Sequence, residues 1–191
     1  MATFTDLTDN LTNHFLIAMP GLADPNFYHT VTYLCDHNQD GAMGLVINRP
    51  MDLMLGELFD YLNIPNPKIE LLDVPIYQGG PVQTDRGFVL HKPMGQWEAT
   101  MPITPQLELT MSQDIIEAIA YGEGPDQYLI ALGYAGWGSG QLEAELASNA
   151  WLNGPAESTI IFDKPIDQRW IASAALLGVQ ISQISPDVGH A

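Results

Sequence analysis

Alternating side chains predict a β-hairpin in the first quarter of the chain. Residues 29–37 fit a strand in which four side chains share one face: Val31, Tyr33, Cys35 and His37. Residues 38–41, Asn-Gln-Asp-Gly, have the composition of a turn, in which glycine supplies a positive φ. Residues 42–48 are apolar on both faces, so we expect the second strand of the hairpin to be central in a sheet, ending at Arg49-Pro50.

The rest of the chain alternates between short strand patterns and helical patterns. Apolar runs predict further strands over 15–19, 76–78, 87–91, 127–132 and 158–162. Helical spacing predicts helices over 55–62, over a segment capped by Ser112 and ending at Gly122, from Gly140 to Trp151, and over 167–177. Residues 92–105 contain three prolines and are predicted to form a covering loop.

These elements predict one domain of mixed α/β class. We find no internal repeat and no low-complexity linker that would divide the chain. Residues 1–14 are polar and are expected to form an N-terminal arm, residues 15–184 the single domain, and residues 185–191 a C-terminal tail.

The composition is that of a globular, strongly acidic protein. The 191 residues are 46% hydrophobic and carry a formal net charge of −17, with a single cysteine, which excludes an intrachain disulfide. The six bases are scattered: Arg49, Lys68, Arg86, Lys92, Lys164 and Arg169. Nucleic acids and anionic membrane surfaces are therefore disfavoured as partners, because both attract clustered cations.

Nothing in the sequence has the pattern of an address or of a membrane span. The first fifteen residues contain no Lys or Arg and no long apolar run, unlike a secretory signal. The apolar stretches are far shorter than the ~20 residues that cross a bilayer. We therefore expect a cytoplasmic protein in a reducing compartment.

A glycine-rich segment at 133–140, predicted as a loop between a strand and a helix, is the first candidate for chemistry. It matches neither a phosphate-binding loop nor a dinucleotide fingerprint, because Gln141 rather than Lys follows Gly140 and no base lies nearby in the sequence. Ser139 is not a nucleophile elbow, because Trp137 and Gln141 stand where glycines are required. The glycines equally suit a tight turn against which Trp137 packs, and the sequence leaves both interpretations open.

Cys35 and His37 are a second, weak catalytic candidate. Two residues apart on one strand face, they could approach so that the imidazole activates the thiol. Burial of Cys35 among apolar neighbours is the stronger alternative, since free cysteine is among the most buried residues. The five histidines lack metal-ligand spacing, so we predict no metal and no cofactor. Arg49 and Arg86 are expected to pair with acids.

Several segments in the same order resemble the YqgE/AlgH family of bacterial proteins. They read FLIAMPGL at 15–22, DPNF at 24–27, YLCDHN at 33–38, GAMGLVINRP at 41–50, GGPV at 79–82, LGYAGWGSGQLE at 132–143 and NAW at 149–151. The resemblance implies a single α/β domain whose sheet bifurcates and wraps into a partial barrel with flanking helices. It also brings the family's usual label of transcriptional regulator, but no catalytic residues.

The sequence favours a non-catalytic cytoplasmic module that regulates or binds through contacts with a protein or a small ligand. We expect the binding face to include Trp137, Gly138, Ser139, Gln141, Asn48 and Arg49, since such side chains gather there in irregular segments. The first alternative is a thiol-dependent enzyme or redox sensor using Cys35 with His37. The second, a regulator that binds DNA directly, conflicts with the net charge and with the lack of a helix-turn-helix pattern. The oligomeric state is left open.

Overall fold

Three antiparallel strands begin the structure, a computed structural model that describes residues 10–184. They are β1 (His14–Ala18), β2 (Val31–Asn38) and β3 (Gly41–Val46), paired in that order. The predicted hairpin is confirmed: β2 and β3 pair on either side of the turn. Gly41 has a φ of +140°, and a Cβ there would lie 2.1 Å from the carbonyl oxygen of Trp137, so only glycine fits.

The sheet divides at β9 (Tyr128–Gly138). The C-terminal half of β9 pairs with β3, whereas its N-terminal half lies between β6 (Val82–His91), which is antiparallel to it, and β5 (Pro75–Gln78), which is parallel. Gly133 stands between the two halves with a φ of +74°, a left-handed conformation that allows the strand to change direction. The bifurcation implied by the family resemblance is therefore built on one long strand.

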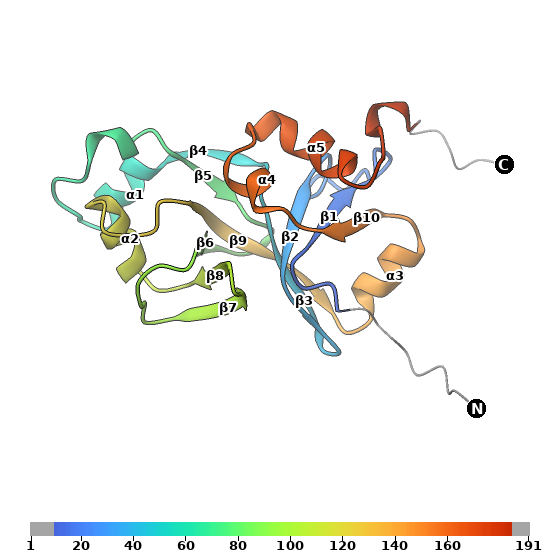
Figure 1. The fold of residues 1–191 in the computed structure, drawn as a ribbon, viewed down its shortest axis with the longest axis horizontal. Helices are drawn as coiled ribbons and strands as arrows, with labels where there is room; N and C mark the ends of the chain where they lie inside the picture. The colour runs from blue at the N-terminus through green and yellow to red at the C-terminus, as the bar shows by residue number, and fades with distance from the viewer. Residues whose placement is uncertain (1–9, 185–191) are drawn as a thin grey trace.

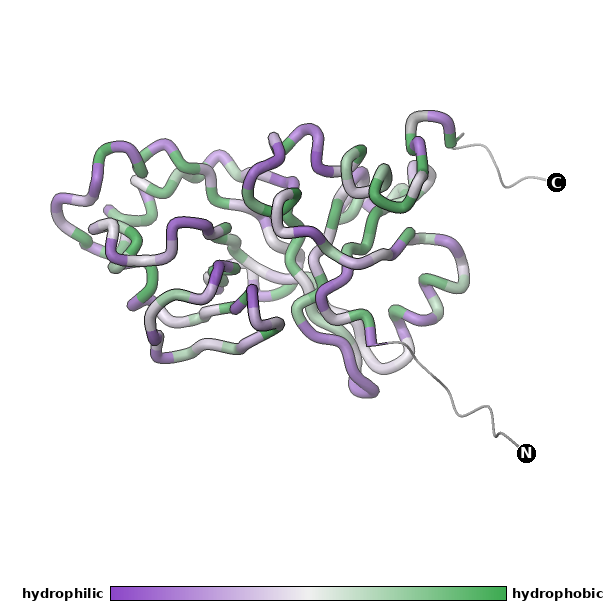
Figure 2. Tube along the Cα trace, viewed as in Figure 1, coloured by the Kyte–Doolittle hydropathy of each residue, from purple (hydrophilic) through white to green (hydrophobic). Residues whose placement is uncertain are grey.

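The remaining strands extend both ends of the sheet. The strand order is β10-β1-β2-β3-β9-β6-β8-β7, and β4 pairs with β5 off this path. The bounds of these outer strands are Trp151–Pro155 for β10, Leu107–Thr110 for β8, Thr100–Thr104 for β7 and Pro50–Met54 for β4. In Figure 2 the strands that cross the middle of the molecule are mostly green, while the tip of the β2–β3 hairpin is purple.

Within the described residues, five short α-helices lie around this sheet and bury three apolar clusters. Figure 1 shows α1 (Leu55–Tyr61) and α2 (Asp114–Ala120) at one end, α3 (Gln141–Ala147) at the other, and α4 (Ser158–Phe162) and α5 (Arg169–Ala175) above the strands. Short 3-10 turns occur at Ile69–Leu71, Ile166–Gln168 and Ile181–Gln183. The largest cluster packs β1, β2 and β6 against α4 and α5, the second lies under α1 and α2, and the third under α3. The protein is a single mixed α/β domain with a curled, mostly antiparallel half-barrel, as expected.

The structure corrects several predicted elements. The apolar run 158–162, predicted as a strand, is α4, and the strand at this edge is β10, which contains the Trp151 expected in a helix. Residues 133–138 are strand rather than loop, since the glycines continue β9. The loop predicted at 92–105 contains β7, whose Pro102 is tolerated because β7 is an edge strand. Ser112 does not cap α2, whose N-cap residue Gln113 makes no side-chain cap bond.

Two further strands, β4 and β8, were not predicted at all. The predicted arm at 1–14 and tail at 185–191 fall mostly outside the described residues, and His14 already begins β1. That division of the chain stays a prediction.

Candidate functional site

Cys35 is buried, as the stronger of the two interpretations expected, and the weaker one, a pairing of Cys35 with His37, does not occur. The residues before and after Cys35 pair with two consecutive residues of β3, which marks a bulge at Cys35. The bulge reverses the alternation of side chains, so Cys35 enters the largest apolar cluster while His37 points to the other face, beside α3. Cys35 is 2% exposed, and burial raises the pKa of its thiol, which opposes formation of the nucleophilic thiolate.

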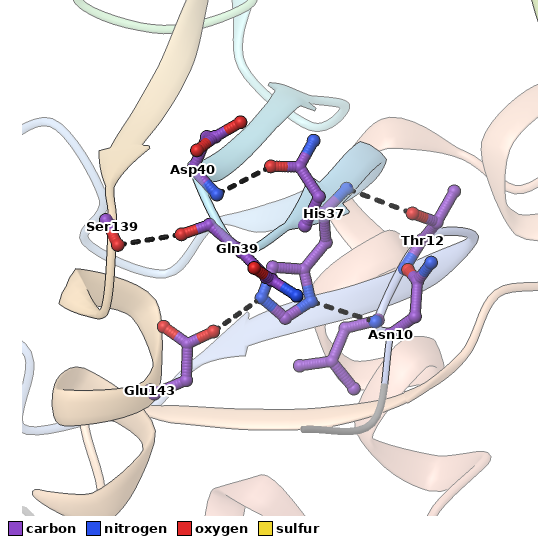
Figure 3. Close-up of polar contacts among 9 residues, drawn as sticks. Asn10, Thr12, His37, Gln39, Asp40, Ser139 and Glu143 are labelled. Carbon is purple, nitrogen blue, oxygen red and sulfur yellow. Dashed lines mark hydrogen bonds and ion pairs between the residues drawn. The ribbon is translucent and has the colours of Figure 1, made fainter. Parts of the chain in front are cut away.

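His37 instead joins the start of the described chain to α3. Its Nδ1 accepts a hydrogen bond from the backbone N–H of Leu11 at 3.0 Å, and its Nε2 lies 2.7 Å from Oε1 of Glu143, as Figure 3 shows. An amide can only donate, so Nδ1 carries no proton and Nε2–H donates to the carboxylate. A backbone hydrogen bond and this bond from His37 hold the pKa of Glu143 below its usual value. Because both ring nitrogens are engaged, His37 has no free lone pair to act as a general base.

Trp137 is a core residue rather than part of an exposed binding face. Its side chain is 6% exposed and belongs to the cluster under α3. The indole N–H groups of Trp137 and Trp151 both donate to Oε2 of Glu145, at 2.7 and 2.9 Å. Gln141 completes the arrangement, since its amide accepts from the N–H of Gly138 and donates to Glu145. Ser139 donates to the carbonyl of Gln39 at 2.7 Å and thereby fixes the hairpin tip (Figure 3).

Asn48 and Arg49 lie beyond the other end of β3, away from the hairpin tip. The Asn48 side chain accepts from the N–H of Val31 and donates to the carbonyl of His29. Arg49 donates to the carbonyls of Pro25, Asn26 and Tyr28, not to an acid, so its predicted ion pair is wrong. The structure therefore does not bring the six predicted face residues to one surface.

Arg86 also lacks the predicted acid partner and lies instead at a cleft. Its guanidinium donates to Oε1 of Gln83 at 3.2 Å and lies 5.5 Å from the centre of the Phe88 ring. The cleft measures about 520 Å³ and is lined by residues of the β2–β3 hairpin, β6 and β9. We call it the barrel cleft, and its charged and large apolar lining residues are Asp36, Asp40, Met43, Arg86, Phe88, Met111, Tyr134 and Trp137.

The barrel cleft has an apolar floor and charges of both signs at its rim. Asp36, Asp40 and Arg86 are exposed, whereas Phe88 is 2% exposed. Of the six residues predicted for the binding face, Trp137 alone lines it. Sequence reasoning missed Phe88 and Tyr134; alternation along β6 could have placed Phe88 beside Arg86, but the approach of β6 to the β2–β3 hairpin comes from the curl of the sheet.

Arg169 also has internal partners. Arg169 is 5% exposed, with its guanidinium bound to the carbonyls of Lys164 and Ile47 and to the hydroxyl of Tyr77. Two of the three arginines are therefore used within the fold, which further weakens a cationic nucleic-acid surface. Within residues 10–184, no three His, Cys, Asp or Glu side chains are grouped closely enough to hold a metal ion. None of the described helices is long and apolar enough to cross a membrane.

Comparison with known proteins finds close relatives along nearly the whole chain. A family model described as DUF179, AlgH-like, matches residues 15–182. A UPF0301 protein of Thioalkalivibrio sulfidiphilus is 56% identical, with 96% of this chain and 98% of the relative covered. A UPF0301 protein of Nitrosococcus oceani is 55% identical, with coverages of 94% and 96%.

Two solved structures share the fold. The solution structure of the AlgH protein from Pseudomonas aeruginosa has a TM-score of 0.79 and 51% identity, with 99% of this chain and 100% of that chain covered. A crystal structure of a Corynebacterium diphtheriae protein has a TM-score of 0.67 over 90% of this chain and 87% of that one. At 17% identity, this second likeness concerns the fold alone.

Proposed function

The chain belongs to the AlgH-like family, and from that premise we propose that it is a non-catalytic cytoplasmic module that binds a ligand or a partner's side chains in the barrel cleft. In this proposal, binding at the cleft passes a regulatory signal through protein or small-ligand contacts. Direct contact with DNA plays no part in it, because the cations that would neutralise phosphates are few and partly used inside the fold.

The observation that carries the proposal is the chemistry of the cleft lining. Ligand sites are concave and mostly apolar, with a few polar groups that fix the orientation of the ligand. Here Phe88, Met43 and Tyr134 offer an apolar and aromatic surface, while Arg86 and the two aspartates offer charges of both signs. A ligand that fits has an apolar body with a carboxylate for Arg86 and a cationic group for Asp36 or Asp40.

The same lining favours binding over catalysis. The described residues around the cleft include no His, Cys, Ser or Lys, so nucleophile–base pairs such as Ser–His or Cys–His are missing there. The one cysteine is buried elsewhere, and the one histidine–carboxylate pair has both ring nitrogens occupied. These features support a role in which the ligand is held without being changed.

The proposal is tested with a panel of dipeptides, each carrying one aromatic or aliphatic side chain, titrated into the ¹⁵N-labelled chain. Peak shifts are expected in the hairpin 36–43 and around Arg86, Phe88 and Gly136. Arg86→Gln should weaken binding of dipeptides with a free carboxylate about tenfold, the usual effect of losing one charge-assisted hydrogen bond.

Lys68→Gln is the matched control, because Lys68 is an exposed cation outside the cleft. It should leave every affinity unchanged. If the shifts cluster on another surface, or if Lys68→Gln weakens binding as much as Arg86→Gln does, the cleft is not the ligand site.

A further inference from the structure

The strand β6 has an unpaired edge at Gly87, between its pairing with β8 and a bulge at residues 83–86, which lie opposite the single residue Gly133 of β9. Its pairing with β8 begins only at Val89, which lies opposite Thr110. Beyond Thr110 the chain leaves the sheet and turns towards α2, so no strand of the described residues lies beside Gly87 on that side. The side chain of Met111 lies near this edge, where its sulfur accepts a hydrogen bond from Arg86 at 3.7 Å. Residues 83–87 are exposed. An exposed strand edge is a template for the addition of another strand.

The backbone of Gly87 is directed at this open edge. Lys92 donates its N–H to the carbonyl of Gln127, so the even-numbered residues of this part of β6 face β9. The odd-numbered residues therefore face the opposite side, where Val89 and His91 meet β8. Gly87 follows the same alternation, and none of the described residues forms a hydrogen bond with its N–H on that side.

Two clefts flank the open edge, one on each face of β6. Val82, Arg86 and Phe88 line the barrel cleft. Asp85, Gly87 and Val89 line a second, mostly apolar cleft of about 180 Å³, which we call the helix cleft because Leu58 and Ile116 of α1 and α2 form its far wall. Met111 lines both clefts, so they meet at the edge where β8 ends.

This arrangement matches the way in which sheets capture extended peptides. In strand addition, main-chain hydrogen bonds provide affinity, and alternate side chains enter pockets on the two faces of the sheet. The two clefts on either side of Gly87 receive such alternate side chains, since consecutive residues of a strand point to opposite faces.

Charge specifies the chemistry of the peptide. At the barrel cleft, Asp36 and Asp40 outnumber Arg86, whose guanidinium already donates to Gln83 and lies over Phe88. The helix cleft is lined mainly by aliphatic side chains, with the carboxylate of Asp85 as its one charge. A basic side chain with an apolar stem suits the first cleft, and an aliphatic side chain suits the second.

We propose that the open edge of β6 at Gly87 binds an extended segment of a partner protein, in which basic and aliphatic residues alternate, as an added strand in line with β8. This inference rests on the proposed function, because it makes the barrel cleft the pocket for alternate side chains of the same partner. It adds the backbone of Gly87 as the anchor and the helix cleft as a second determinant of specificity.

The test uses a fluorescein-labelled peptide of alternating Lys and Val and the full chain. The matched variants are Gly87→Pro, which removes the outward N–H, and Gly87→Ala, which keeps it. A Cβ at Gly87 meets only Leu132, at 4.0 Å, so alanine fits. Gly87→Pro should weaken binding about tenfold more than Gly87→Ala does, because both variants add a side chain at the cleft and only proline removes the N–H.

A second arm leaves the protein unchanged and alters the peptide. Two methylated peptides are compared, one methylated at the odd-numbered backbone nitrogens and the other at the even-numbered ones. Only one of these two sets of N–H groups faces the strand with which the peptide pairs, so one methylated peptide should lose binding and the other should keep it. Hydrogen exchange at the Gly87 amide should slow when the parent peptide is bound. This arm decides the question if Gly87→Pro lowers the thermal stability of the chain.

Each contrary result is distinguishable. If the parent peptide does not bind, if both methylated peptides bind as tightly as the parent, or if the Gly87 amide stays unprotected, strand addition is wrong. If the effect of Arg86→Gln on the dipeptides persists in that case, the barrel cleft is still a ligand site, and only the strand model fails. If the chain dimerises and Gly87→Pro makes it monomeric, the edge binds a second copy, which also overturns the proposal.

Discussion

Replacing Glu145 with alanine tests the interpretation of Trp137 and Trp151 as core residues. One carboxylate oxygen accepts both indole N–H groups, at 2.7 and 2.9 Å, and the rings are 6% and 5% exposed. Alanine leaves two nearly buried donors without an acceptor, and each such group costs about 1–3 kcal/mol. Water entering the vacated space and the higher helix propensity of alanine offset part of that cost, so we expect a net loss of about 2–3 kcal/mol.

Glu145→Gln separates the loss of the acceptor from the loss of the charge. Its amide oxygen can still accept from both indoles, but its NH₂ group would face the NH₂ of Gln141, which now donates to the other carboxylate oxygen. We expect a loss of about 1 kcal/mol, the net worth of one hydrogen bond. Glu117→Ala is the matched control, because Glu117 is an exposed helical glutamate on α2, and its effect should stay within about 0.5 kcal/mol.

The measurement is urea unfolding followed by far-UV circular dichroism, together with the indole N–H peaks in ¹⁵N spectra. Relative to the parent chain, two indole N–H peaks should move in both Glu145 variants and should stay in place in Glu117→Ala. If Glu145→Ala unfolds within about 0.5 kcal/mol of the parent chain, the buried indole donors do not depend on this carboxylate and the reasoning is refuted.

Two further predictions concern the buried thiol of Cys35 and the hydrogen bonds of Glu143. Cys35 should react with iodoacetamide only as fast as the chain opens, because it is 2% exposed and burial raises its pKa; rapid alkylation in the folded chain with a midpoint near that of a free thiol would contradict this. Glu143→Gln should lower the stability of the chain at neutral pH, because hydrogen bonds hold the pKa of Glu143 below its unfolded value. A depressed pKa contributes stability that is present above the unfolded value of about 4.3 and is lost as the pH falls through the folded value, so the urea midpoints of the two chains should converge there. A difference that stays constant across this range would show that the charge of Glu143 is not responsible.

The β2–β3 hairpin could be predicted from the sequence because its signals are local. The sequence pattern of 29–37 fits a strand, the turn composition is specific, and Gly41 adopts the positive φ that the turn requires. The bulge at Cys35 left no such signal, and it alone separates Cys35 from His37. The two residues therefore looked like a pair in the sequence although the fold places them on opposite faces.

Errors elsewhere share the same cause, since non-local pairing overrode local propensity. The glycine-rich composition of 133–138 indicates a loop, yet these residues belong to β9 because this strand pairs with β3 and β6. The apolar run 158–162 is too short for periodicity to distinguish a strand from a helix. It cannot join the sheet beside β1, because β1 is already paired on both sides, with β10 and with β2. Pro102 pointed to a loop because a sequence does not reveal which strand lies at an edge.

The barrel cleft could be predicted only in fragments. Asp36 and Asp40 belong to the predicted hairpin, and Arg86 is one of only six bases in the chain. Their approach to Phe88 and Tyr134 depends on the division of the sheet at Gly133, which no local pattern encodes. The site therefore emerges from topology rather than from a motif.

Methyl-labelled methionine offers the most direct measurement of whether the barrel cleft is the binding site. Of the eight methionines, Met43 and Met111 line the cleft, whereas Met54 and Met94 are exposed outside it. On addition of the alternating Lys and Val peptide or a bound dipeptide, the methyl peaks of Met43 and Met111 should shift and show contacts to the ligand, while those of Met54 and Met94 stay in place. Shifts at Met54 or Met94 with unchanged Met43 and Met111 would contradict the account.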